Sequence, residues 1–454
     1  MVNPYQPYAE IFIARLYRDY GIKTVALHTN WRTRMILEGR LPILRSPAMA
    51  GHYMIPRAGL APIAARLRRR HDVVAVVPHD EGAVSWLARL AQMLDLSWAQ
   101  PQVLPAFRDK ASLKALIARN DPTVRLNAFA LVSTPAEVHR WVARNEVGRY
   151  VLKPNDGSGN RDVVFFGADS AVADVARHFD VVDGAVIAEE FIGGDEYWVN
   201  GQVDSAGTPT VTGIGRYDRR DLNGKPNLEV GASSLATTEP GFAALKSYAE
   251  QVLAATGLRR SPFHLEAKID DRGPCLIEVG ARLCGDMLTL AESWQHGQAA
   301  DLMGAALDGY VSDDSRGPLA LDWARYDTHH YSQVNGVSMT RQRLVRVMGV
   351  AEVEQVPGFL FWIKQPRSGD TVLRTEDLTE KPWALVISGR DADELQEREA
   401  QVRRSLVLVG EDDVGRGLRS RLTLQAARLG KVWSSRPRPY QALALVSEVG
   451  AYDS

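Results

Sequence analysis

The chain has 454 residues, of which 45% are hydrophobic and 24% charged, and its formal net charge is −1. This size and composition predict a globular protein of about three lobes. The near-zero charge gives no overall field that favours nucleic acid or an anionic membrane as a partner. Only two cysteines are present, so a disulfide framework and a thiol-rich zinc site are excluded. We expect a cytoplasmic protein, because residues 1–10 lack a signal-peptide pattern and no apolar run approaches membrane-spanning length.

Residues 1–105 alternate helical and strand patterns, which predicts parallel βαβ units. The expected elements are a helix at 11–20, strands at 24–27 and 73–77, and a helix at 83–94. Ligands of such sheets bind beyond the carboxyl ends of the strands, where His79, Asp80 and Glu81 stand. Asp80 or Glu81 could equally do no more than cap the following helix.

Residues 106–190 predict a lid-like unit. We expect helices at 109–119 and 136–145, and strands at 127–132, 150–153 and 163–166. The last two strands flank the glycine-rich turn Lys153-Pro154-Asn155-Asp156-Gly157-Ser158-Gly159-Asn160. Glycines let backbone amides approach a phosphate closely, and Lys153 adds positive charge. The turn lacks the Gly-Lys-Ser/Thr ending of a Walker loop, and taken alone it is also typical of a simple turn.

Residues 191–330 are rich in strand patterns and hold the most informative motif. Before them, a short strand at 185–188 leads into a hinge, Glu189-Glu190-Phe191-Ile192-Gly193-Gly194-Asp195-Glu196. Further on, the Asp-Asp-Arg-Gly turn at 270–273 separates two apolar runs, which predicts a hairpin. Pairing across that hairpin would bring Glu266 and Glu278 together. Two adjacent carboxylates need a shared proton or a cation, and their hard oxygens suit magnesium. On this stretch alone, a solvated pair of surface glutamates is an equal alternative.

The remainder of the chain predicts helices at 242–256 and 299–307, and then a smaller unit over residues 331–415. That unit has expected strands at 360–364 and 383–388 and a charged helix at 392–406. Residues 416–454 form a basic tail with two prolines, which we interpret as a loosely packed surface segment. Arg282, four residues after Glu278, is placed to contact a phosphate or a carboxylate in a bidentate manner.

Taken in order, these motifs resemble the ATP-grasp superfamily, and within it the carboxylate–amine ligases of the L-amino acid ligase type. The resemblance covers roughly residues 70–400. It implies an α/β ATP-grasp fold: a Rossmann-like parallel-sheet domain at 1–105, a lid at 106–190, a catalytic antiparallel sheet at 191–330, and an α+β C-terminal lobe at 331–415. It also implies ATP and two Mg²⁺ ions, with Mn²⁺ as a substitute, as cofactors.

The same resemblance implies roles for individual residues. Those expected to contact the nucleotide are Lys110, Lys153, Ser158 and Gly159 at the phosphates, Glu189 with the backbone of Glu190 and Ile192 at adenine, and Glu196 at the ribose. Glu266 and Glu278 would ligate the metal ions, and Arg282 would act with Lys153 on the reacting phosphate. Glu229 resembles a glutamate that contacts the substrate amine, although a surface role is an alternative. Gly280 stands near the substrate where many members have an asparagine, so the second ion would keep more water.

Other polar and aromatic candidates have two interpretations. His264 could support Glu266 or be an ordinary core histidine, whereas Trp294, His296 and Trp323 are expected to pack. The expected reaction joins a small-molecule carboxylate to an amine through an acyl phosphate, releasing ADP and phosphate. Two alternatives stay open, namely a kinase or carboxylating enzyme of the purine-ligase type and a non-catalytic nucleotide-binding regulator. Family members are often dimers, so a homodimer is one expected assembly.

Overall fold

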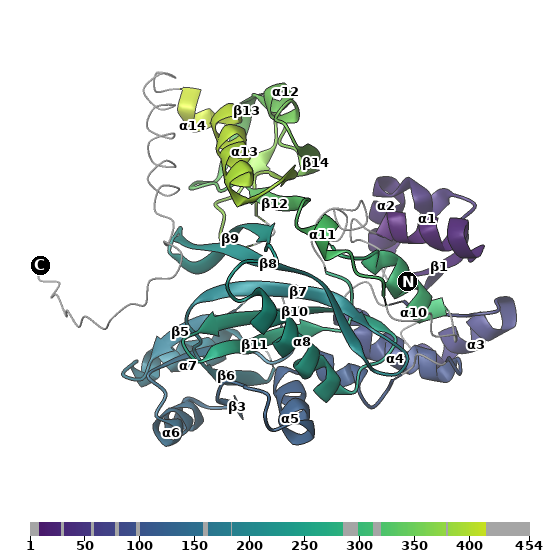
Figure 1. Ribbon diagram of the computed structural model, residues 1–454, viewed down its shortest axis with the longest axis horizontal. Coiled ribbons are helices and arrows are strands. Elements are labelled where there is room, and N and C mark those ends of the chain that lie inside the picture. Colours follow the sequence, from purple (N-terminus) through teal and green to yellow (C-terminus); the bar gives the residue numbers. More distant parts are fainter. Residues whose placement is uncertain are drawn as a thin grey trace, which may run out of the picture.

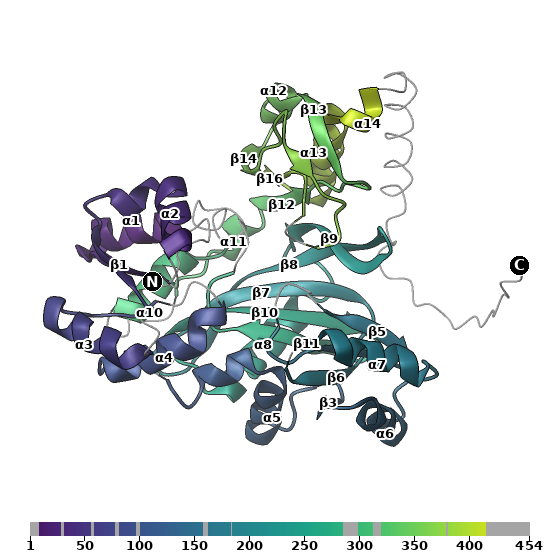
Figure 2. The ribbon, with the colours of Figure 1, turned by 180° about the vertical axis from the view of Figure 1, so that it is seen from behind.

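The computed structural model describes residues 9–28, 31–55, 59–77, 81–96, 100–157, 162–182, 184–284, 298–311, 319–377 and 380–414. Within these ranges the strands form sheets of two, four, eight and three strands. Figures 1 and 2 show that the large sheet lies centrally, with the N-terminal elements on one side and the C-terminal lobe at one end. None of the described helices is long and apolar enough to cross a bilayer.

The N-terminal elements surround a short parallel strand pair. Their bounds are α1 Ala9–Tyr20, β1 Thr24–His28, α2 Trp31–Arg40, β2 Met49–Met54, α3 Leu60–Arg70 and α4 Val84–Met93. Gly21 follows the last residue of α1, and its φ of +66° favours glycine. The predicted strand at 73–77 is wrong, because these residues pair with no other strand in the part of the chain that the structure describes. A cavity of about 460 Å³ lies between this segment and β1, so the apolar run packs without pairing.

The lid-like unit contains a four-stranded antiparallel sheet in the order β3-β6-β4-β5 among the described residues. Its elements are α5 Lys110–Asn120, β3 Phe129–Val132, α6 Pro135–Asn145, β4 Arg149–Pro154, β5 Val164–Gly167, α7 Val172–Val181 and β6 Val186–Glu190. The predicted hairpin is confirmed, because Tyr150 pairs with Phe166 and Leu152 with Val164. Thr134 caps α6 by accepting from the Glu137 amide, and Pro135 begins the helix. Trp141 and Tyr150 belong to a separate small core under this sheet.

The large sheet has the strand order β11-β10-β7-β8-β9-β12-β16-β14 over the described residues. Its first part comprises β7 Asp195–Val203, β8 Pro209–Leu222, β9 Lys225–Ser234, β10 Ser261–Asp270 and β11 Gly273–Gly280. Helix α8, Phe242–Thr256, lies against it, with Leu245 and Val252 fully buried. The helix predicted at 242–256 is therefore confirmed. The helices α10 Leu302–Val311 and α11 Trp323–Tyr326 complete this part of the chain.

The C-terminal lobe continues the large sheet and also forms a three-stranded sheet of its own, in the order β15-β13-β17. Its elements are β12 His330–Asn335, β13 Gln342–Met348, α12 Val350–Glu354, β14 Phe359–Lys364, β15 Thr371–Val372, β16 Ala384–Gly389, α13 Ala392–Ser405, β17 Val407–Gly410 and α14 Glu411–Val414. Strand β12 pairs with β9, so the sheet crosses the boundary proposed at residue 330. Asp391 caps α13 by accepting from the Glu394 amide. The basic tail lies outside the described residues.

Candidate active site

The two central carboxylates lie directly opposite each other on the β10–β11 hairpin. Glu266 and Glu278 are register partners in the antiparallel pair, as the sequence predicts. The register shifts by one immediately after Glu266, which leaves Ile277 as an additional residue on β11. A bulge of this kind bends the strand and re-aims the adjacent side chains. The pair is therefore positioned by backbone geometry that composition alone does not reveal.

Hydrogen bonds hold Glu266 from the same face of the sheet. The Tyr217 hydroxyl donates to its carboxylate at 3.0 Å, and His264 Nε2 lies 3.5 Å from the same oxygen. His264 Nδ1 donates in turn to Asn200 Oδ1 at 2.7 Å. Burial raises the pKa of Glu266, but His264, Arg219 and Tyr217 outweigh burial and lower the pKa to about 2. The carboxylate is thus ionised, and His264 supports it and is more than a core residue.

Glu278 faces Lys110 at the start of helix α5. Lys110 Nζ lies 3.2 Å from Glu278 Oε2 and donates to the Gly157 carbonyl at 2.6 Å. The helix begins here because the Asp109 carboxylate accepts from the Ser112 amide at 2.7 Å. Asn155 Oδ1 accepts from the Ala111 amide at 3.0 Å, which fixes the glycine-rich turn against the helix. The Lys110 ammonium group, the Glu278 carboxylate and the glycine-rich turn at Gly157 therefore lie close together.

A buried three-charge cluster lies beside this point. Glu189 is 1% exposed and pairs with both Lys153 and Lys114, the latter at 2.8 Å. Burial raises the pKa of Glu189, but the two lysines outweigh it and lower the pKa to about 2. Lys114 also donates to Asn127 Oδ1 at 2.5 Å and to the Leu276 carbonyl at 3.1 Å, two residues before Glu278.

Sequence reasoning missed Lys114. The pattern that could have revealed it is its spacing of four residues from Lys110 on one helix, which places both ammonium groups on the same face. A buried lysine on a helix also needs an anionic partner, and Glu189 supplies one.

The predicted hinge is ordered by contacts from two neighbouring segments. The Glu190 amide donates to the Ala128 carbonyl at 2.8 Å, and its own carbonyl accepts from Asn127 Nδ2 at 2.9 Å. Its carboxylate pairs with Arg272 at 2.6 Å. The Ile192 side chain is buried.

Glu196 lies at the start of β7 among cations. It pairs with Arg219, lies 3.8 Å from Lys268 Nζ and accepts from Asn227 Nδ2 at 3.4 Å. Alternate residues of a strand share a face, so Glu196 and Trp198 point to the same side, and Trp198 is the register partner of Glu266. Glu196 and the carboxylate pair therefore share one face of the large sheet.

The predicted substrate residues lie at two separate places. Glu229 is buried and pairs with Lys381 at 3.3 Å and with Asn335 Nδ2 at 3.3 Å, both from the C-terminal lobe. Gly280 is the register partner of His264, and Arg282 follows it, donating to the Leu283 carbonyl at 3.0 Å.

The remaining candidate residues either pack in the core or lie outside the described residues. Trp323 packs edge-on against Phe242 and Tyr326, so the packing role expected for it is confirmed. Ser158, Gly159, His79, Asp80, Trp294 and His296 lie outside the described residues. The side chain of Glu81 is also not described.

The donor set fits magnesium bound to phosphate. Across the described residues no group of three or more His, Cys, Asp or Glu side chains converges as a metal cage. Mg²⁺ seldom uses such a cage, because it keeps several waters and takes one or two carboxylates plus substrate phosphates. Glu266, held ionised, and Glu278 supply such a pair of carboxylates.

Comparison with known proteins agrees with this geometry. Residues 150–290 match the family model described as ATP-grasp domain. The chain is 28% identical over 254 residues to dapdiamide A synthase of Enterobacter agglomerans, which covers 52% of this chain and 57% of that protein. It is also 24% identical over 234 residues to an uncharacterised protein of Sinorhizobium fredii, covering 49% and 46% of the two chains. The chain thus spans about half the length of these curated relatives.

Solved structures share the fold over nearly the whole chain. The L-amino acid ligase of Bacillus licheniformis has a TM-score of 0.68 at 17% identity, covering 88% of this chain and 95% of that one. The biotin carboxylase domain of a Hydrogenobacter thermophilus 2-oxoglutarate carboxylase, in complex with MgADP, has a TM-score of 0.64 at 15% identity and covers 90% of both chains.

Residues 150–290 match the ATP-grasp domain, and the chain shares its fold with these solved structures. Within the ATP-grasp superfamily, the chain resembles the carboxylate–amine ligases of the L-amino acid ligase type.

Proposed function

We propose that this protein is an ATP-dependent carboxylate–amine ligase that forms an amide through an acyl phosphate and releases ADP and phosphate. The observation that carries the proposal is the opposed pair Glu266 and Glu278, with Lys110 at 3.2 Å from Glu278. The similarity to dapdiamide A synthase and to an L-amino acid ligase supports the ligase class.

The first step transfers the γ-phosphoryl group of ATP to a substrate carboxylate. Because two anions approach each other, cations must lie around the reacting phosphate. Lys110 and Lys153 lie beside the glycine-rich turn and would hold the phosphates, and Arg282 would contact the transferred group. Magnesium on Glu266 and Glu278 would neutralise the charge that develops on the phosphate oxygens.

The second step is attack by an amine on the acyl carbon, which forms the amide bond and expels phosphate. An acyl phosphate hydrolyses in water, so the site must exclude solvent while the amine arrives. The β4–β5 hairpin and its glycine-rich turn would provide this cover. Glu229 is the proposed contact for the substrate ammonium group, which requires it to exchange Lys381 for the substrate.

The test is incubation of the protein with ATP, Mg²⁺ and a panel of amino acids. We expect release of ADP and phosphate with at least one pair, and loss of about 10²–10³ in rate for Glu278→Gln. Release of AMP and pyrophosphate would contradict the proposal. Hydroxylamine in place of the amine separates the alternatives, because it traps an acyl phosphate as a hydroxamate, whereas a kinase acting on another group leaves none.

A further inference from the structure

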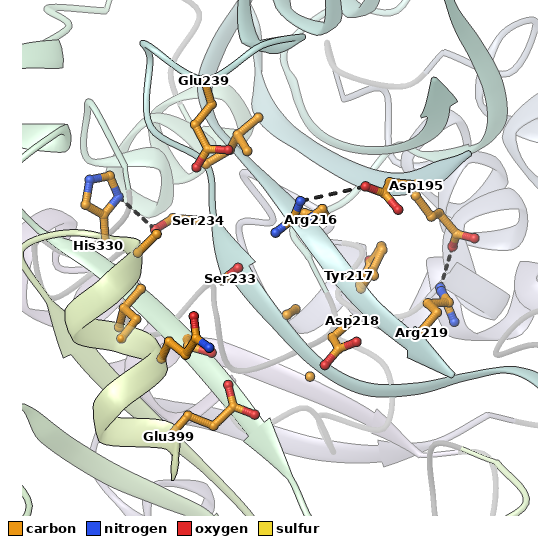
Figure 3. Close-up of a pocket in the computed structure, with 18 of the residues that line it drawn as sticks. Asp195, Arg216, Tyr217, Asp218, Arg219, Ser233, Ser234, Glu239, His330 and Glu399 are labelled. Atoms are coloured by element: carbon orange, nitrogen blue, oxygen red, sulfur yellow. Dashed lines mark hydrogen bonds and ion pairs between the residues drawn. The ribbon is translucent and has the colours of Figure 1, made fainter. Parts of the chain in front are cut away.

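A second cavity lies along strands β8 and β9 of the large sheet, beside the carboxylate site. Its volume is about 440 Å³, and strands β8, β9 and β12, helix α13 and the loop before α8 line it (Figure 3). This volume falls in the usual range for small-molecule sites. At one end the cavity reaches Glu196, Arg219 and Lys268, so it adjoins the proposed ribose end of the nucleotide site.

The strand register shows which side chains form the floor of the cavity. Arg216 pairs with Ser233, and Ser233 pairs with Ser332, so these three residues form one row across β8, β9 and β12. Tyr217, the next residue on β8, bonds Glu266 on the opposite face. Since successive side chains of a strand point to opposite faces, the row with Arg216 faces away from the carboxylate pair.

A few polar groups of this cavity are weakly committed to protein partners, although Asp218 pairs with Arg220 and Glu399 with Arg403. Arg216 is 3.7 Å from Asp195, and the two side chains are 42% and 44% exposed, a pair that is readily exchanged for a ligand. The Ser233 and Ser332 hydroxyls and the Glu239 carboxylate make no side-chain hydrogen bond or ion pair with the other described residues. Figure 3 shows Glu239 and Arg216 on the wall above Ser233, with Glu399 of α13 across from them.

The cavity is therefore lined by both a positive group, Arg216, and a negative group, Glu239. A simple anion on Arg216 would be repelled by Glu239, whereas Asp218 and Glu399 are already paired with Arg220 and Arg403. A molecule that carries one carboxylate and one ammonium group satisfies both sides, because the guanidinium takes the carboxylate and the glutamate takes the ammonium.

We propose that this cavity is a second binding site for a zwitterionic amino acid or short peptide, with its carboxylate on Arg216 and its ammonium group on Glu239. The site is separate from the reacting centre, and the inference goes beyond the proposed function because it needs no turnover. Ser233 and Ser332 add neutral hydrogen bonds along the floor.

The test is equilibrium dialysis of the full chain, without ATP, against labelled L-alanine and L-alanyl-L-alanine. We expect saturable binding of at least one probe. The probe with the lower Kd shows whether the cavity prefers a single amino acid or a dipeptide. Arg216→Met and Glu239→Gln should each raise the Kd about tenfold or more, the effect of losing one charge-assisted hydrogen bond. Glu352→Gln, which changes an exposed carboxylate of α12 that does not line the cavity, is the matched control and should leave the Kd unchanged.

Blocked probes assign the two ends of the ligand. N-acetyl-L-alanyl-L-alanine lacks the ammonium group and L-alanyl-L-alanine amide lacks the carboxylate, so each should bind more weakly than the free dipeptide. Glu239→Gln should remove the discrimination against the acetylated probe. Melting temperatures of the variants confirm that they fold. Absence of saturable binding in the millimolar range, or binding lost in Glu352→Gln but kept in Arg216→Met and Glu239→Gln, would overturn the proposal.

Discussion

The substitution Lys114→Met tests the buried charge cluster. Lys114 is 1% exposed and contacts Glu189 at 2.8 Å, Asn127 at 2.5 Å and the Leu276 carbonyl at 3.1 Å. The change leaves Glu189 with Lys153 alone. The pKa of Glu189 lies at about 2 against an ordinary 4.5, and this difference corresponds to about 3 kcal/mol of stability. Breaking a buried pair by removing one partner costs about 3–5 kcal/mol, which agrees in size.

The pH dependence identifies the cause. A carboxyl whose folded pKa is lowered stabilises the fold fully above pH 4.5, and this stabilisation is lost as the pH falls toward 2. The variant has a less depressed pKa, so its deficit should be largest at pH 7 and shrink on acidification below 4.5. The assay is the melting temperature of wild type and Lys114→Met from pH 7 to pH 3.

Two controls and one functional measurement complete this test. Lys114→Arg keeps the charge and should recover most of the stability. Lys225→Met breaks an exposed pair at 3.8 Å and should cost less than about 1 kcal/mol. Because Lys114 also contacts the strand that carries Glu278, Lys114→Met should weaken ATP binding, measured as a higher Kd. A deficit that is absent at pH 7, or constant with pH, would refute the reasoning.

Further predictions concern the carboxylate site, the hinge and the N-terminal contact. Tyr217→Phe removes the 3.0 Å bond to Glu266 and should raise the Mg²⁺ concentration needed for half-maximal phosphate release several-fold, whereas an unchanged requirement would argue against this role. Gly194→Ala should lower the melting temperature and weaken ATP binding. The reason is that Gly194 has a φ of +79° and a Cβ would lie 1.9 Å from the Ile269 carbonyl oxygen. A melting curve equal to that of the wild type would contradict this prediction. Arg15→Ala breaks the pair with Asp301 at 2.8 and 2.6 Å that joins α1 to the residue before α10, and should cost about 1 kcal/mol by thermal unfolding, less in high salt.

Much of the architecture was predictable because local patterns agree with tertiary packing. Helix 242–256 and the β10–β11 hairpin follow from apolar periodicity and turn residues, and the pairing of Glu266 with Glu278 follows from the hairpin. The run at 73–77 has the composition of a buried strand, but composition cannot say whether a neighbour lies within hydrogen-bonding distance.

Contacts between distant segments could not be predicted. Lys381 reaches Glu229 across 152 positions, and Lys114 reaches the Leu276 carbonyl across 162. Neither pairing leaves a periodic pattern in the sequence, because each depends on how the lobes pack. The cavity at Arg216 could not be predicted for the same reason, since three strands and α13 together line it.

Transfer of ¹⁸O is the most direct test that an acid group is phosphorylated at the Glu266–Glu278 hairpin. A carboxylate substrate found by the amino acid panel is labelled with ¹⁸O in its carboxyl group and turned over with ATP, Mg²⁺ and an amine, and the released phosphate is analysed by mass. An acyl phosphate passes one carboxyl oxygen to phosphate, so we predict phosphate with one ¹⁸O atom alongside ADP. Label found in AMP, or in neither phosphate nor AMP, would contradict the account.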